Sequence, residues 1–153
     1  REVSAGTLIG QGDARRVNLF RVTTNLPTVW GLSPVQGRLF QDGEDRPGAD
    51  LVGVLSHRFW REFFQADPGV LNRTFLLDGR TITIVGVMTP TIEFGNISDF
   101  DIWVPLALDP SKPRDARTLS VMGTLAPGAT VETAGAEMAA IAKRLAEAYP
   151  ATN

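Results

Sequence analysis

Few side chains in this sequence could carry out chemistry, and the first of them is His57, its only histidine. An imidazole at the start of a predicted helix could act as a general base. The residues around it, however, form no pattern of nucleophile and base. We therefore expect a solvated or structural histidine at this position.

The acidic side chains gather in one polar loop, over residues 41–50. They are Asp42, Glu44, Asp45 and Asp50. Clustered carboxylates could hold a cation or act as general acid and base, but their spacing lacks the alternating oxygen ligands and the terminal glutamate of a calcium loop. The sequence therefore predicts a solvated loop without a metal, in which one acid pairs with Arg38 or Arg46.

Cofactor binding and thiol chemistry find no support in the sequence. The Gly10-Gln11-Gly12 segment is too short for a dinucleotide fingerprint, and no G-x-S-x-G elbow occurs. The chain has no cysteine, which excludes disulfides, thiolate nucleophiles and cysteine-bound zinc. We expect no catalytic residue, no cofactor and no metal.

Charge and hydropathy exclude further classes of protein. The 153 residues carry a net charge of −2, and the scattered basic residues do not form the basic face that binds nucleic acid. No apolar run approaches the ~20 residues that cross a bilayer. Because the first residue is Arg1 rather than methionine, we expect a piece excised from a longer protein.

The aromatic side chains could line a ligand pocket, but such residues more often form a core. Trp60 and Trp103 stand on predicted regular elements, so we expect both in the core. Phe94 and Phe100 stand in an irregular stretch and are the best candidates for an exposed contact surface.

The elements that must position these residues alternate between strand and helix patterns. The strands predicted from period-two apolar patterns are 3–9, 15–24, 51–55, 74–78, 80–88, 101–106 and 118–125. The helices predicted from their caps and apolar spacing are 26–30, 57–65 and 131–148.

Local signals fix several boundaries of these elements. Asn25, Ser56 and Thr130 are predicted to cap the three helices through their side chains. Asp78-Gly79 predicts a type I′ hairpin, because this turn needs positive φ at both central residues.

The pattern as a whole predicts an α+β fold with two lobes. The weakest joins are the polar segments 41–50 and 107–117. We expect residues 41–106 to form a small inserted α/β lobe, and residues 1–40 and 107–153 to form a second lobe from both ends of the chain.

Several sequence motifs then follow one another in an informative order. They are W-G-L-x-P-x-x-G-R-L-F, E-D-R-P-G-A, D-P-G-V-L-N-R-T-F-x-L-D-G-R, D-I-W-V-P-L and G-T-L-A-P-G-A-T-V-E. In this order they resemble the periplasmic core domain of MacB-type ABC transporter permeases, in particular the permease-only branch common in acidobacteria. The resemblance covers nearly the whole chain.

The resemblance implies a non-catalytic periplasmic domain of an inner-membrane permease used in efflux or export. It implies a lobe similar to the porter subdomains of efflux pumps, with the small α/β lobe inserted in it. The implied partners are the transmembrane helices of the parent permease, a second permease copy, a periplasmic adaptor, and a fused or separate cytoplasmic ATPase.

Four residues of the chain match a motif of this family: Gly37, Arg38, Phe40 and Asp45. The family defines no catalytic residues here, so we assign these four a structural role. An ion pair between Arg38 and Asp45 is predicted to pin the acidic loop.

Two other functions stay open at the level of sequence. A soluble periplasmic ligand-binding module would bind a small molecule without any membrane-anchored parent. A hydrolase with an unfamiliar site is disfavoured by the missing pattern of nucleophile and base.

Overall fold

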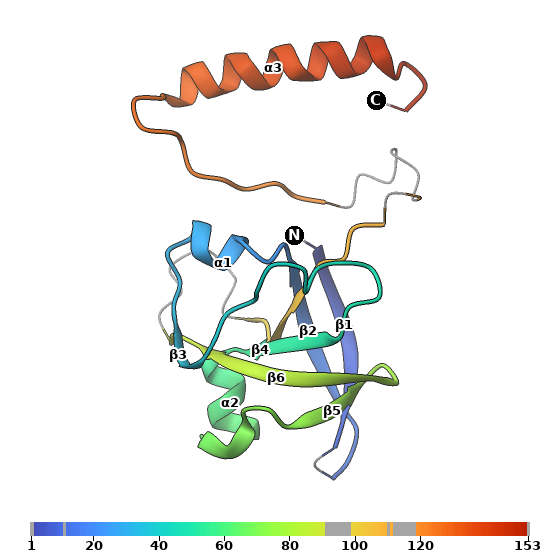
Figure 1. Cartoon of the computed structure of the whole chain (residues 1–153), viewed down its shortest axis with the longest axis vertical. Helices are drawn as coiled ribbons and strands as arrows, with labels where there is room; N and C mark the ends of the chain where they lie inside the picture. The colour runs from blue at the N-terminus through green and yellow to red at the C-terminus, as the bar shows by residue number, and fades with distance from the viewer. Residues whose placement is uncertain (1, 11, 91–98, 110, 112–118, 153) are drawn as a thin grey trace. The chain divides into compact units, whose positions relative to one another are not determined.

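The computed structural model describes residues 2–10, 12–90, 99–109, 111 and 119–152 (Figure 1). The chain divides into two compact units, Arg1–Leu108 and Asp109–Asn153. We refer to the first as the sheet unit and to the second as the helix unit, and describe each by itself.

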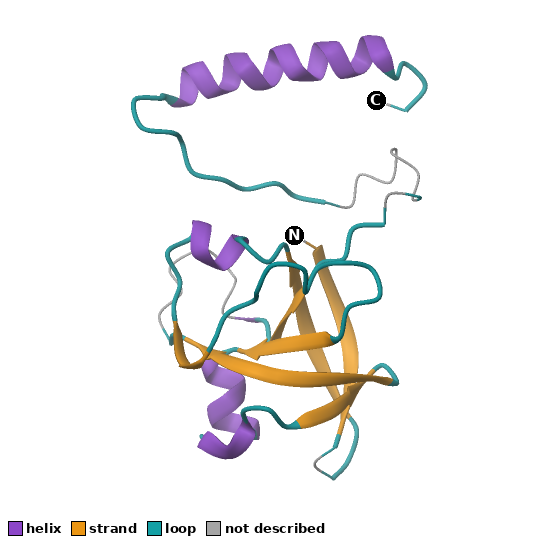
Figure 2. Cartoon of the chain, in the orientation of Figure 1, coloured by secondary structure: helices purple, strands orange, loops and turns teal. Residues whose placement is uncertain are grey.

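A mixed sheet makes up most of the sheet unit (Figure 2). Its strands are β1 (Glu2–Ile9), β2 (Arg15–Val22), β3 (Pro34–Gly37), β4 (Leu51–Leu55), β5 (Thr74–Leu77), β6 (Arg80–Met88) and β7 (Ile102–Pro105). Their order is β3-β6-β4-β7-β2-β1-β5, and β5 also pairs with β6. Six of the seven strands therefore close into a ring, to which β3 is attached through β6.

Strand pairing joins the two ends of this unit's sequence. β1 and β2 form an antiparallel pair, whereas β2 and β7 run parallel with Phe20 opposite Trp103. β4 runs parallel to β6 and antiparallel to β7. Side chains alternate between the two faces of a strand. The strands of the ring therefore present residues both to its inside and to its outside.

The inward side chains form the first of two apolar clusters. Leu19 of β2, Ile84 of β6 and Ile102 of β7 are each fully buried in it. Helix α2 (His57–Phe63) adds Phe59 and Trp60, and the 3₁₀ helix η1 (Pro68–Val70) adds Val70. Helix α2 lies in the lower part of the sheet unit in Figure 1, and Phe59 and Trp60 are its buried residues.

The second apolar cluster lies on the outer face of β2, β7, β4 and β6. It is centred on Trp103 and Phe20, which are both 0% exposed. Helix α1 (Leu26–Val29) covers it together with Leu39 and Phe40. Both Trp60 and Trp103 are buried, which confirms the core positions predicted from the sequence.

Several local predictions are confirmed. Asp78 and Gly79 have φ of +51° and +78°, as a type I′ turn requires, and they join β5 to β6. The side chain of Ser56 accepts a hydrogen bond from the Phe59 N–H at 3.1 Å and so caps α2. The predicted cap at Asn25 is wrong, because its side-chain oxygen accepts the Thr23 hydroxyl instead.

The helix unit contains one long helix, α3 (Val131–Ala148). The Thr130 side chain accepts the Thr133 N–H at 3.2 Å, and the Thr133 hydroxyl accepts the Thr130 N–H at 2.9 Å. This reciprocal pair is a capping box that satisfies two N–H groups at the start of the helix. The predicted helix and its cap are therefore confirmed.

The strand predicted over residues 118–125 is wrong over the part that the structure describes. Residues 119–125 form no strand, and Val121 is 93% exposed. An alternating pattern becomes a strand only when a neighbouring strand accepts its hydrogen bonds, and none of the described strands pairs with this segment.

The structure also divides the chain differently from the predicted lobes. The first three strands, within residues 1–40, belong to the same sheet as the strands of residues 41–106. The parallel pairing of β2 with β7 joins the two segments, so no lobe boundary appears at residue 41. The α+β class holds, with one mixed sheet and three α-helices among the described residues.

Candidate functional site

The acidic loop is held to the sheet by Arg38. Its guanidinium donates to both carboxylate oxygens of Glu44, at 2.6 and 3.2 Å, and to the Leu39 carbonyl at 3.0 Å. Glu44 also accepts the Gln41 N–H at 2.8 Å. One carboxylate thus closes the turn and binds the arginine in a bidentate pair.

The predicted pair of Arg38 with Asp45 is therefore wrong. The turn from Gln41 to Glu44 directs the Glu44 carboxylate at the guanidinium. The Asp45 side chain instead accepts the Thr24 hydroxyl at 3.3 Å. These contacts hold the acidic loop in a defined conformation.

Two glycines let the backbone cross closely where β3 ends. Gly37 has a φ of +70°, and a Cβ added there would collide with the Val85 carbonyl oxygen. A Cβ added to Gly86 would collide with the Arg38 carbonyl oxygen. Only glycine fits this crossing, which places Arg38 beside the acidic loop.

Phe100, one of the two predicted contact residues, is half-buried. Its ring stacks on Phe20 at 4.6 Å between centroids, and Phe20 meets Trp103 edge-on at 4.8 Å. Much of the Phe100 ring therefore packs against the outer apolar cluster. Phe94, the other predicted contact residue, lies outside the described residues.

The indole N–H of Trp103 is buried among these rings. It has no hydrogen-bond partner within the described part of the chain, while Trp30 packs perpendicular to it at 6.1 Å. The outer apolar cluster therefore holds one indole donor that no described residue satisfies.

His57 lies on the outward face of α2, half-exposed, and its ring meets Trp60 at 5.6 Å. Together with four neighbours it lines an open hollow of about 430 Å³. The other lining residues are Arg58, Arg61, Glu62 and Pro90. None of these five carries a side-chain hydroxyl or thiol that His57 could activate.

Asp101 organises the base of α2 from the start of β7. It is 8% exposed and receives the Arg58 guanidinium at 2.7 Å and the Asn18 N–H at 2.9 Å. Its carbonyl also accepts the Ser56 N–H at 2.9 Å. Sequence reasoning missed Asp101, and it named Glu44 only as one of four acids that could pair with Arg38 or Arg46. An aspartate directly before an apolar strand was the one available signal for Asp101.

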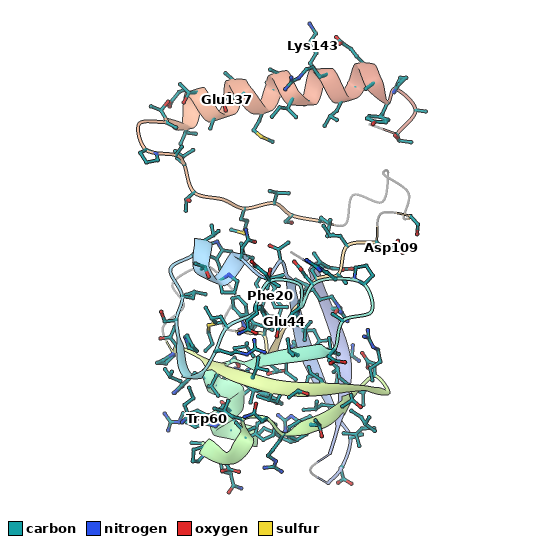
Figure 3. All side chains as sticks on the ribbon, viewed as in Figure 1. Phe20, Glu44, Trp60, Asp109, Glu137 and Lys143 are labelled. Carbon is teal, nitrogen blue, oxygen red and sulfur yellow. The ribbon has the colours of Figure 1, made fainter. Side chains whose placement is uncertain are left out.

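An apolar stripe along α3 is exposed within the helix unit. Val131 is 73% exposed, Met138 62% and Ile141 39%, and α3 buries none of its residues (Figure 3). The three residues recur at helical spacing, so they form one face of an amphipathic helix.

The described residues include neither a metal-binding group nor a membrane-spanning helix. Across the described ranges, no three His, Asp or Glu side chains come together in a group that could hold a metal ion. The described helices also include none with the length and apolar character needed to cross a bilayer.

The sequence matches a known family of domains. The family model described as "MacB-like periplasmic core domain" matches residues 1–141. The macrolide export ATP-binding/permease protein MacB of Neisseria gonorrhoeae is 30% identical over 103 residues, which make up 67% of this chain and 16% of that relative. The chain therefore corresponds to a small part of the relative's length.

Two solved structures share the fold. The periplasmic region of MacB from Actinobacillus actinomycetemcomitans superposes with a TM-score of 0.67 at 18% identity, covering 94% of this chain and 64% of that one. The extracellular domain of the noncanonic ABC-type transporter YknZ from Gram-positive bacteria gives a TM-score of 0.53 at 19% identity, covering 68% and 51%.

Proposed function

The chain belongs to the MacB-like periplasmic core domain family, and we propose that this periplasmic domain of an ABC transporter permease works as a mechanical coupling element. It passes movement of the membrane-spanning part of its permease to the periplasmic surface, where substrate or a partner protein is handled during export. The domain takes part in no bond-breaking step.

The observation that carries this proposal is the geometry of the closed sheet. Glu2 pairs with Arg21, and Arg21 pairs with Val104, so the start of β1 and the end of β7 are separated by only one strand. At strand spacings of about 4.8 Å, they lie roughly 10 Å apart. The start of β1 and the end of β7 therefore lie close together at one end of the sheet unit, and α2 lies at the other end (Figure 1).

Such a unit can move as one rigid body. Its strands are tied to one another around the ring, and its core is packed on both faces of β2, β7, β4 and β6. Packed interiors transmit displacement with little compression. Motion applied where β1 starts and β7 ends would therefore appear at the α2 end.

The remaining parts of the proposal concern partners. We assign ATP hydrolysis to a fused or separate cytoplasmic ATPase, consistent with the name of the Neisseria relative, which joins an ATP-binding part and a permease. Two permease copies and a periplasmic adaptor would complete the working assembly.

The test is a distance measurement between spin labels in the full transporter. The chain has no cysteine of its own, so a cysteine at the exposed Thr81 of β6 gives one label in each copy of the domain. We expect the distance between copies to change when ATP is added. An unchanged distance would contradict the coupling role.

A second pair of labels within one domain provides the control. Cysteines at Thr7 of β1 and Thr81 of β6 both lie on exposed positions of the closed sheet. Their distance should stay constant with and without ATP, because the sheet moves as one body. A change in this pair would show that the sheet itself deforms.

A further inference from the structure

The apolar residues of α3 alternate between spacings of three and four residues along the whole helix. They form the α3 stripe: Val131, Ala134, Met138, Ile141, Leu145 and Ala148. This is the spacing of the positions through which two helices pack in a coiled coil. Val131, Met138 and Ile141 are exposed, whereas most helical stability in proteins comes from packing of such a face. The α3 stripe therefore has the form of a surface for a second helix.

The charges of α3 favour a protein partner over a membrane. Its acidic residues are Glu132, Glu137 and Glu147, and its basic residues are Lys143 and Arg144. Helices that lie in a membrane surface are rich in lysine and arginine on their polar side, but α3 carries more acids than bases. A protein helix therefore fits the α3 stripe better than a lipid surface does.

The sizes of the side chains select an antiparallel pair of α3 helices. In a parallel pair of identical helices each position faces itself, so both alanines of the stripe would face alanines and leave space between the helices. In an antiparallel pair each small side chain faces a larger one, because the order is reversed. The pairs are then Val131 with Ala148, Ala134 with Leu145, and Met138 with Ile141. Alternating large and small residues across facing positions fills the space between elements.

The charges beside the stripe select the same orientation. Glu137 and Arg144 stand seven residues apart on one flank of the stripe, and charges on the flanks set partner choice and orientation in coiled coils. In the antiparallel register, Glu137 lies level with Ala142 of the second copy, two residues or about 3 Å along the axis from Arg144. The two-fold symmetry of the pair repeats this contact. In a parallel pair Glu137 would face the other flank, which carries Gly135 and Ala142.

We propose that α3 pairs in the antiparallel direction with α3 of a second copy of this chain. The inference rests on the two permease copies of the proposed function, and it assigns the surface through which their helix units meet. The eighteen residues of α3 make about two and a half heptads, fewer than the three to four of a sustained coiled coil. The pair is therefore weak between isolated chains and strengthens when one assembly holds both copies.

Disulfide cross-linking of the 153-residue chain tests the orientation. The chain has no cysteine of its own, so Val131→Cys and Ala148→Cys can be prepared separately, mixed and oxidised. We expect the main product to join one copy of each variant, because only the antiparallel pair brings these positions together. Mass spectrometry identifies the product. A main product that joins two copies of Val131→Cys, or a yield no higher than that of Lys143→Cys, would overturn the proposal.

Exchange of the two charges tests the contact between the flanks. Arg144→Glu should weaken dimer formation at least tenfold in sedimentation equilibrium at millimolar protein, since it places acids opposite acids twice. The double variant Glu137→Arg with Arg144→Glu should restore it. Lys143→Glu makes the same change of charge away from the stripe and should change dimer formation less than twofold. A chain that stays monomeric, or a double variant that does not recover, would contradict the pairing. Circular dichroism verifies that α3 is intact in each variant.

The full transporter tests whether something else covers the stripe. Val131→Cys and Ala148→Cys are combined in one permease that is otherwise free of cysteine, and oxidation should link two copies. Cysteines that resist maleimide and form no link between copies would show that another segment of the same permease covers the stripe, which would overturn the proposal. The spin labels at Thr81 lie in the sheet unit, so a negative result for α3 leaves the test of the coupling role independent.

Discussion

Helices α2 and α3 begin with the same kind of cap but differ in whether their side chains are buried. Each starts at a hydroxyl side chain that accepts the N–H three residues later, Ser56 in α2 and Thr130 in α3. The seven residues of α2 place Phe59 and Trp60 in the inner apolar cluster. The eighteen residues of α3 bury none of their side chains.

The difference separates what starts a helix from what stabilises it. A cap and good helix formers are enough to specify α3, which is rich in alanine. Most helical stability in proteins nevertheless comes from packing of an apolar face, and α2 has that packing. We therefore expect changes in the sheet unit to affect unfolding of the whole unit, and changes in α3 to affect the helix alone.

The largest effect should follow from truncating the core. Trp103→Ala removes a fully buried indole from the outer apolar cluster and should lower the free energy of unfolding by about 3–5 kcal/mol, measured by urea denaturation. The matched change in α3 is Met138→Ala, at a side chain that is 62% exposed. A comparable loss in Met138→Ala would contradict the contrast between the two units.

Removing the helix caps should lower stability by less than truncating the core. The loss should concern the sheet unit for the cap of α2, and the helix alone for the cap of α3. Ser56→Ala takes away a buried hydrogen bond at the start of α2 and should cost about 1–2 kcal/mol in unfolding of the sheet unit. Thr130→Ala should cost about 1 kcal/mol of helix stability in α3.

Two spectroscopic signals distinguish these outcomes. Far-ultraviolet circular dichroism reports helix content, while tryptophan fluorescence reports the sheet unit, because Trp30, Trp60 and Trp103 all lie within it. Thr130→Ala should change the circular dichroism signal and should not shift the unfolding transition followed by tryptophan fluorescence. A shifted fluorescence transition would show that the stability of the two units is linked.

The ion pair between Arg38 and Glu44 should contribute less to the free energy of unfolding than the cap of α2 does. Arg38 and Glu44 are 37% and 16% exposed in their side chains, so a double-mutant cycle with Arg38→Ala and Glu44→Ala should give a coupling of about 1 kcal/mol. The same cycle with Asp45→Ala in place of Glu44→Ala should give nearly none. The reverse ranking would contradict the observed pairing.

The smallest effect concerns pH and the first turn of α3. The N–H of Glu132 itself and then the Thr130 hydroxyl hold the pKa of Glu132 below its usual value. A carboxylate with a lowered pKa in the folded state stabilises that state above the ordinary glutamate range, and the contribution is lost as pH falls through the lowered pKa. The helix content of α3 should therefore decrease slightly in acid.

Glu132→Gln should remove this dependence on pH. Glu137→Gln, further along the same helix, makes the same change of charge outside the first turn and serves as the control. An acid titration of circular dichroism that is identical in the wild-type chain and in Glu132→Gln would contradict the assignment to Glu132.

The contrast between the helices also explains how far the sequence could predict the fold. Signals that act within a few residues were reliable: the hairpin at Asp78-Gly79, the cap at Ser56 and the cap at Thr130. Each depends on a turn conformation or one side-chain hydrogen bond. The same rule failed at Asn25, where a neighbouring hydroxyl competes for the side chain.

Predictions that needed a distant partner were less reliable. The pattern of residues 118–125 contains no information about whether a neighbouring strand is present. The parallel pairing of β2 with β7 brings together residues more than 80 positions apart, since Leu19 pairs with Ile102. No local pattern indicates such a pairing, so the boundary between the predicted lobes could not be placed correctly.

The candidate site was harder to predict than the fold. Arg58 and Arg61 looked like ordinary surface residues of a helix, and the hollow depends on Pro90 and on Asp101 beneath Arg58. The choice of Glu44 over Asp45 as the partner of Arg38 depends on the turn between Gln41 and Glu44. Both features arise from backbone geometry that residue types alone do not specify.

The ring of strands also bears on how the domain avoids aggregation. An exposed sheet edge offers unpaired N–H and C=O groups on which a second chain can polymerise. Here β5 pairs with both β1 and β6, which occupies edges that an open sheet would expose. The strand at the end of the order, β3, is four residues long, begins with Pro34 and shifts register against β6. A short edge with a proline and an irregular register is a poor template for growth of a fibril, so many copies of the domain can be close to one another without joining their sheets.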